Sequence, residues 1–207
     1  MLSYSCKVKQ KGMFMETKRV RLTGRLQKQG RIRHPDFKKY SVKEVLSRLT
    51  DPKNPHPVDF NGTPVYMSKS KYRVFEKSHI CAKCGLEAQY FILEKHGLWA
   101  NKGNVFSISK DYRFHLMAIK EDGNVVEFTQ DHILPKALGG INDLINYQTM
   151  CSNCNRSKGH KVEEADIGTM GKLLEELKGR SIPTNILPFQ IKLQEVVNEY
   201  LIKKYRR

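Results

Sequence analysis

The sequence predicts an α+β fold, in which a core of short strands and a helix is held together by four cysteines and followed by further helices. Short segments of alternating apolar residues, bounded by turn residues, occur between positions 90 and 129 and indicate strands. Two longer segments with helical periodicity, 162–177 and 189–205, follow near the C-terminus. Two C-x-x-C pairs enclose the strand region, and such pairs are typical of a structural metal site.

The first 40 residues form a basic segment, with twelve Lys and Arg against two acidic residues and a formal charge of +10. Large apolar residues are few and three glycines interrupt the segment, so we expect a flexible or weakly ordered basic arm with a short strand near 20–22. The whole chain has a formal charge of +16. A surface this basic attracts a polyanion, and the charge therefore predicts nucleic acid as the partner.

Residues 41–77 are expected to form an N-terminal region of a helix, a hairpin and a second helix. Ser41-Val42-Lys43-Glu44 is a capping-box pattern, in which Ser41 and Glu44 each satisfy a main-chain donor at a helix start. Asn61-Gly62 lies between two apolar runs and is the strongest short signal for a β-hairpin. The second helix is expected over 68–77.

Residues 78–160 are expected to form the core, and residues 161–207 a helical region that packs on it. The core strands are expected over 90–93, 106–109, 114–120 and 125–129. The turn residues 121–124 join the last two strands. Gly179, Pro183 and Pro188 separate the two C-terminal helices.

Membrane association is not expected. No apolar run approaches the roughly 20 residues that a spanning helix requires. The N-terminus lacks the apolar core of a secretory signal. We therefore expect a cytoplasmic protein, of a bacterium or of a phage-infected cell.

The spacing of the cysteines predicts a structural zinc ion. Structural zinc is usually held by four thiolates or imidazoles in a tetrahedron, and in a reducing compartment paired C-x-x-C motifs indicate zinc rather than disulfides. A span of 66 residues separates the two pairs, so the ion would fasten two distant chain segments. Neighbouring cations, Lys83, Arg156 and Lys158, are expected to offset the charge of the thiolates. The four expected ligands are Cys81, Cys84, Cys151 and Cys154.

A second group of polar residues lies around the last cysteine pair and fits phosphodiester hydrolysis. His132 could act as general base, because an imidazole titrates near neutral pH. Asp131 and Asn155 offer hard oxygen ligands, which suit Mg²⁺ or Mn²⁺ better than zinc. Asp131 and His132 are neighbours and would point to opposite faces of a regular strand, so the strand must end or twist there.

The order of these residues resembles the HNH endonuclease family, the ββα-metal nucleases. The resemblance covers roughly residues 78–160 and rests on Asp131-His132-x-x-Pro135, on Asn146, and on Cys151-x-x-Cys154-Asn155-x-x-Lys158-Gly159. It implies that Asp131 and Asn155 hold one catalytic ion and that Asn146 holds the loop that orients His132. Asparagine replaces the final histidine of the family name, which is a common variant. Many members of this size are phage or mobile-element enzymes, and we expect that type here.

The function favoured by these residues is a metal-dependent endonuclease that acts on double-stranded DNA, as a monomer or a homodimer. The alternative is a zinc-stabilised DNA-binding module without cleavage activity, and an RNA-directed nuclease is a third reading. A pure binder has no need for Asp131, His132 and Asn155 together, which favours the enzyme. The expected phosphate contacts are Arg156, Lys158, Arg19, Arg21, Arg25, Arg31 and Arg33.

Overall fold

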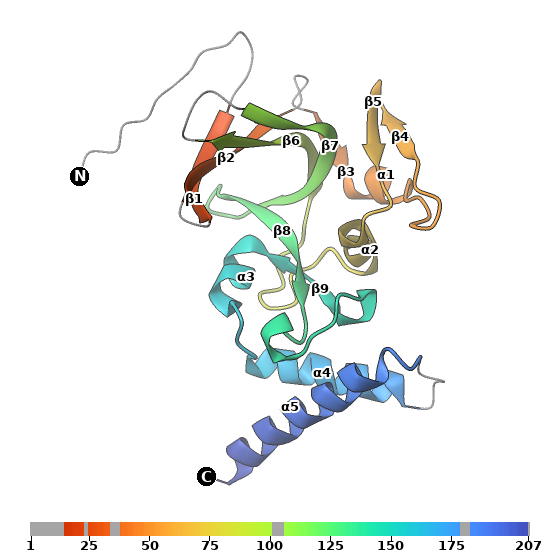
Figure 1. Cartoon of the computed structure of the whole chain (residues 1–207), viewed down its shortest axis with the longest axis vertical. Coiled ribbons are helices and arrows are strands. Elements are labelled where there is room, and N and C mark those ends of the chain that lie inside the picture. Colours follow the sequence, from red (N-terminus) through yellow and green to blue (C-terminus); the bar gives the residue numbers. More distant parts are fainter. Residues whose placement is uncertain (1–14, 23–24, 34–37, 101–105, 179–182, 207) are drawn as a thin grey trace, which may run out of the picture. The chain divides into compact units, whose positions relative to one another are not determined.

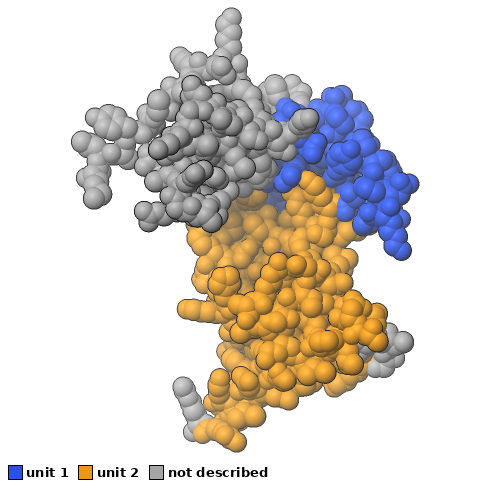
Figure 2. Space-filling model, viewed as in Figure 1, with its two compact units in different colours: residues 1–68, 89–117 blue, residues 69–88, 118–207 orange. Residues whose placement is uncertain are grey.

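The computed structural model describes residues 15–22, 25–33, 38–100, 106–178 and 183–206 (Figure 1). The chain divides into two compact units (Figure 2). The first unit comprises residues 1–68 and 89–117, and the second comprises residues 69–88 and 118–207.

The first unit contains an antiparallel sheet in the order β1-β2-β6-β7, with β3 paired to β6. The basic segment therefore differs from the expected flexible arm. Its described residues form two strands that pair from Met15↔Ile32 to Leu22↔Arg25, and β2 pairs in turn with β6. Residues 1–14 lie outside the described part. The strands of this sheet are β1 (Met15–Leu22), β2 (Arg25–Arg33), β3 (Lys39–Ser41), β6 (Tyr90–Ala100) and β7 (Phe106–Ile119), the last leaving the unit after Met117.

Strands β6 and β7 are longer than the sequence predicted. The expected break between 109 and 114 is absent, because β7 is continuous from Phe106 to Ile119. Tyr112 and Arg113 pair in register with Lys95 and Glu94 of β6, and the register then shifts between Lys95 and Gly97, which places a β-bulge at the expected break. A β-bulge takes up extra residues in one strand without ending the pairing, which explains why β7 continues through this stretch.

The remaining elements of the first unit follow the local signals. Ser41 caps helix α1 (Val42–Leu46), and its hydroxyl accepts from the Glu44 N–H at 3.1 Å. Strands β4 (Pro57–Phe60) and β5 (Thr63–Tyr66) form the predicted hairpin. Its turn is Asn61-Gly62, with φ of 52° and 80°. The core contains an edge-to-face cluster of aromatic rings, Tyr40, Phe60, Phe91 and Phe114.

The second unit contains the strand–strand–helix order that the resemblance to the ββα-metal nucleases implied, although the strand over 147–151 was not among the strands predicted from the residue pattern. Strand β8 (Val125–His132) pairs antiparallel with β9 (Tyr147–Cys151), and α3 (Ser152–Lys158) follows directly. Helix α2 (Ser70–Lys77) contacts both strands. Two short 3₁₀ helices, η1 (Lys136–Leu138) and η2 (Leu144–Asn146), lie in the loop between β8 and β9.

The C-terminal helices α4 (Glu164–Leu177) and α5 (Leu187–Tyr205) pack against each other and against that loop (Figure 1). Leu134 of the loop is fully buried with Met170 of α4 and Leu193 of α5. The terminal helices therefore cover the loop that follows β8. None of the helices in the described ranges has the length and apolarity that a bilayer span requires.

Candidate active site and metal centre

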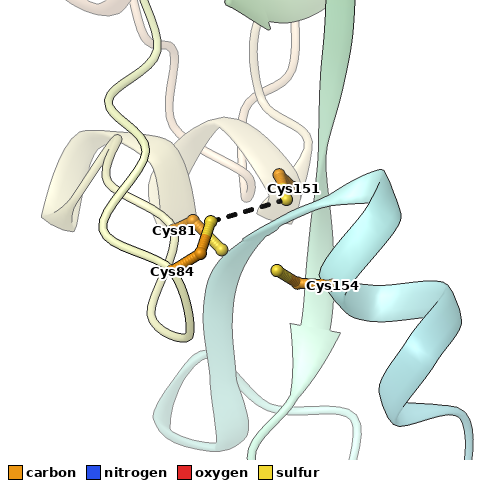
Figure 3. Close-up of side chains that lie close together, drawn as sticks. All are labelled: Cys81, Cys84, Cys151 and Cys154. Carbon is orange, nitrogen blue, oxygen red and sulfur yellow. Dashed lines mark hydrogen bonds between the residues drawn. The ribbon is translucent and has the colours of Figure 1, made fainter. Parts of the chain in front are cut away.

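Four thiols meet where β9 passes into α3 (Figure 3). Cys151 ends β9, Cys154 lies in the first turn of α3, and Cys81 and Cys84 lie on one loop after α2. The Ala82 N–H donates to the Thr149 carbonyl at 2.9 Å and fastens that loop to β9. All four Sγ atoms lie within 4.8 Å of one another, and those of Cys84 and Cys151 are 3.9 Å apart.

This spacing fits a metal ion in a tetrahedron of sulfurs. A zinc ion bound to four thiolates at about 2.3 Å sets the sulfurs about 3.8 Å apart. Burial and the neighbouring thiols Cys151 and Cys84 raise the pKa of Cys154, and burial raises that of Cys151. Burial also opposes ionisation of Cys81, but the main-chain N–H groups of Cys151, Cys84 and Lys83 lower its pKa to about 7. Further thiolates in this cluster would need a cation to offset their charge. The cluster is therefore compatible with a structural metal site.

The loop after β8 is held together by the buried side chain of Asn146. Its Oδ1 accepts from the Leu134 N–H at 2.9 Å, and its Nδ2 donates to the carbonyls of Leu134 and Ile141, both at 3.0 Å. Asn146 is 0% exposed, so its side chain makes these hydrogen bonds away from water. Gly140 lies so close to Leu134 that a Cβ would stand 1.8 Å from its carbonyl oxygen. Only glycine fits at that position.

His132 is the last residue of β8, and its ring lies on a different side of the strand from the Asp131 carboxylate. Its Nε2 is 3.0 Å from Oδ1 of Asn142, and its ring packs edge-on against Tyr147 at 4.8 Å between centroids. Burial raises the pKa of Tyr147, so its hydroxyl stays protonated and donates to Asn142 Oδ1 at 3.3 Å. Because Oδ1 is an acceptor only, its contact with His132 requires a proton on Nε2 and leaves Nδ1 as the basic nitrogen.

Asp131 and Asn155 lie on the other face of β8. Thr129 and Asp131 alternate along the strand and share one face. Thr129 Oγ1 accepts from Asn155 Nδ2 at 2.8 Å, which places the Asn155 amide on that face and leaves its Oδ1 available. Asp131 Oδ2 accepts from Gln148 Nε2 at 3.0 Å, whereas its Oδ1 has no hydrogen bond within the described part of the chain. One hard oxygen of each residue is thus available to a cation.

Lys158 was expected to contact a DNA phosphate, but its side chain is buried and not on the surface. Its side chain is 1% exposed, and its Nζ is 2.7 Å from Asp131 Oδ2 and 3.1 Å from Asp166 Oδ1. An ammonium with these buried partners is not available to a phosphate on the surface. Lys83, which was expected to offset the thiolates, forms an ion pair with Glu163 at 2.6 Å. Arg156 is exposed on α3, so a phosphate contact remains open to it.

The other residues expected to bind DNA belong to the first unit. Arg19 and Arg21 lie on β1, and Arg25, Arg31 and Arg33 lie on β2. Their side chains lie outside the described part of the structure. Sequence reasoning did not single out the polar residues that surround the candidate site, namely Thr129, Asn142, Tyr147, Gln148 and Asp166. No motif marked them, because each makes its contact through the pairing of β8 with β9, the folding of the loop between these strands, or the packing of α4.

Two antiparallel strands, a helix that begins at a cysteine cluster, and a histidine at the end of the first strand define this part of the chain as a ββα unit. Residues 120–167 match the family model described as HNH endonuclease, from the turn before β8 to the first turn of α4. This segment is therefore similar to the HNH endonuclease family. No curated protein and no solved structure matches the chain.

Proposed function

We propose that this chain is a DNA endonuclease that depends on a divalent metal ion and hydrolyses phosphodiester bonds of double-stranded DNA. The observation that supports it most directly is that Asp131 of β8 and Asn155 of α3 lie at one face of β8, each with one oxygen available, and that His132 follows Asp131 at the end of the strand. These residues lie inside the segment that matches the HNH endonuclease model, and such nucleases act on DNA.

Asp131 and Asn155 would hold one Mg²⁺ or Mn²⁺ ion through their Oδ1 atoms. Both are hard oxygen donors, which these ions prefer over sulfur or nitrogen. Thr129 fixes the Asn155 amide in the orientation that presents its oxygen. When bound, such an ion supplies positive charge for the phosphate and for the leaving oxygen.

His132 would act as general base and take a proton from the attacking water. Asn142 and Tyr147 hold the ring, and the contact of Nε2 with Asn142 leaves Nδ1 to accept that proton. Asn146 would serve the site indirectly, because it staples the loop that begins at the His132 strand end. Arg156, exposed on α3, would contact a DNA phosphate, as would the arginines of β1 and β2.

The cysteine cluster would hold a structural zinc ion. Its four sulfurs match the ligand number and the spacing of such a site. Because Cys154 and Asn155 are adjacent in α3, the ion would also fix the helix that presents an oxygen to the catalytic cation. The two ions would therefore be different metals with different roles.

Plasmid relaxation tests the proposal. The zinc-loaded chain is incubated with supercoiled plasmid and Mg²⁺ or Mn²⁺, and the variants Asp131→Asn and Asn155→Ala are assayed beside it. We expect nicked or linear DNA with the wild type, strongly reduced cleavage with both variants, and reversible arrest by mild EDTA. Binding of the plasmid without cleavage under every divalent ion would favour the DNA-binding module, and faster cleavage of structured RNA would favour an RNA-directed enzyme.

A further inference from the structure

Among the described residues of the second unit, the most deeply buried charge is the Lys158 ammonium at the end of α3. Four acceptors surround it: Asp131 Oδ2 at 2.7 Å, the His132 carbonyl at 2.8 Å, Asp166 Oδ1 at 3.1 Å and the Ile133 carbonyl at 3.4 Å. An ammonium has three donors, and the three shorter contacts already satisfy all of them. Lysine is almost never fully buried unless it is paired, and here both neighbouring carboxylates pair with it.

The pairing is reinforced by Gln148, which lies opposite Asp131 on β9. Its Nε2 donates to Asp131 Oδ2 at 3.0 Å and is 3.3 Å from Asp166 Oδ1. The donors Lys158 and Gln148 and the carboxylates of Asp131 and Asp166 thus form one hydrogen-bonded network. It carries one positive and two negative charges. The net negative charge stays next to the oxygen of Asp131 that has no partner in the described structure, where it favours a cation.

Asp166 is itself held rigidly by the start of α4. Its Oδ2 accepts from the Glu163 N–H at 2.9 Å as one half of a capping box. Its Oδ1 is therefore directed at Lys158 and Gln148. Asp166 lies on α4, which follows the ββα unit. It was not among the residues expected to act in catalysis.

We propose that Lys158, held in place by Asp166, is a positioning residue for both Asp131 and His132. The inference rests on the proposed function, because it assigns these two residues their roles. The ammonium occupies Oδ2 of Asp131 and so leaves Oδ1 to the divalent ion. The same ammonium holds the main-chain carbonyl of His132, which fixes the strand end that carries the general base. Asp166 offsets the charge of Lys158, so that Asp131 keeps its attraction for a cation.

Three variants of the zinc-loaded chain test this inference: Asp166→Asn, Lys158→Met and, as a matched control, Lys161→Met, which changes an exposed lysine in the same segment. Binding of Mn²⁺ is measured without DNA by electron paramagnetic resonance, so this readout does not depend on cleavage. kcat and KM on plasmid are measured separately. Circular dichroism confirms that each variant is folded at the assay temperature.

Asp166→Asn is expected to weaken Mn²⁺ binding by about tenfold, because Lys158 then offsets the charge of Asp131 alone. Lys158→Met is expected to bind Mn²⁺ at least as tightly as wild type, because a positive charge is removed, while kcat falls by about tenfold or more and KM changes little. Lys161→Met is expected to change none of these quantities. A purely structural role would lower Mn²⁺ binding and kcat together.

Two results would overturn the inference: unchanged Mn²⁺ affinity in Asp166→Asn, or unchanged kcat in folded Lys158→Met. If Lys158→Met does not fold, the nearly isosteric Asp166→Asn decides the matter through its Mn²⁺ affinity. If the wild type cleaves no DNA under any divalent ion, the proposed function fails. The Mn²⁺ affinities then decide alone: weaker binding in Asp166→Asn with undiminished binding in Lys158→Met supports the positioning of Asp131 by Lys158, and any other result overturns it.

Discussion

The side chain of Asn146 and the main chain of Leu134 are joined by two hydrogen bonds, one from the Leu134 N–H to Oδ1 and one from Nδ2 to the Leu134 carbonyl. The Asn146 amide thus both donates to and accepts from the main chain of one residue, as a neighbouring strand would, and so closes the loop after β8. The Ile133 N–H in turn donates to the Asn146 carbonyl at 2.9 Å. The loop that leaves the candidate active site is therefore built on one asparagine.

Asn146→Ala is expected to lower the free energy of unfolding by about 3 kcal/mol or more, because buried main-chain groups lose their partners at about 1–3 kcal/mol each. The melting temperature should fall by roughly 10 °C for a chain of this size. Thermal melts monitored by circular dichroism measure the change. Asn198→Ala, on the exposed side of α5, serves as control and should melt like the wild type. Equal melting of both variants would contradict the stapling role.

Gly140→Ala is expected to destabilise the chain strongly, because the new Cβ would lie 1.8 Å from the Leu134 oxygen and 2.9 Å from Asn146 Nδ2. The chain offers a matched control in Gly171→Ala on α4, where nothing lies within 4 Å. That change should stabilise by about 0.5–1 kcal/mol, since alanine favours a helix over glycine. Urea unfolding of the two variants should therefore give shifts of opposite sign, and shifts of the same sign would count against the close approach.

Zinc binding is expected to weaken steeply as the pH falls, because protons compete with the ion for four thiolates. The raised pKa values of Cys151 and Cys154 act in this direction, since those thiols regain their protons at a higher pH than ordinary thiols. A chromophoric zinc indicator measures the ion released on acidification, and the melting temperature should drop at the same pH. Cys151→Ser should retain less zinc, whereas Cys6→Ser should retain as much as wild type. Equal zinc content in both variants would contradict the ligand assignment.

Asn142→Ala is expected to lower kcat by about tenfold with little change in KM, because His132 loses the acceptor that fixes its proton on Nε2. Asn142→Asp keeps an acceptor oxygen at the same place and should restore part of the loss. Single-turnover cleavage of a plasmid separates the chemical step from binding. If Asn142→Ala cleaved like the wild type, the orientation of His132 would have another source.

Much of the site could be predicted because its signals are local. The C-x-x-C spacing, the order Asp131-His132 and the position of Asn155 after Cys154 are all read within a few residues, and the Asn61-Gly62 turn predicts its hairpin in the same way. The boundaries predicted for the four sequence segments remain predictions. The metal assignments and the role of each polar residue remain proposals, because they depend on ions and DNA.

The features that were missed depend on contacts between distant segments. Lysine in a basic chain predicts exposure, yet Lys158 is buried, because carboxylates from β8 and α4 converge on it. The basic strands β1 and β2 were expected to be weakly ordered, since they have few large apolar residues. Their pairing with each other and with β6, more than 60 residues further along the chain, supplies the main-chain hydrogen bonds that a local pattern does not reveal.

The measurement that tests the central claim most directly compares plasmid cleavage by wild type, His132→Ala and the control His56→Ala, which changes an exposed histidine of the first unit. With Mg²⁺ and with zinc retained, we predict that His132→Ala loses about 10²- to 10⁴-fold in the cleavage rate, the usual contribution of a general base, while His56→Ala cleaves like the wild type. A folded His132→Ala chain that cleaved plasmid at the wild-type rate would contradict the assignment of this site.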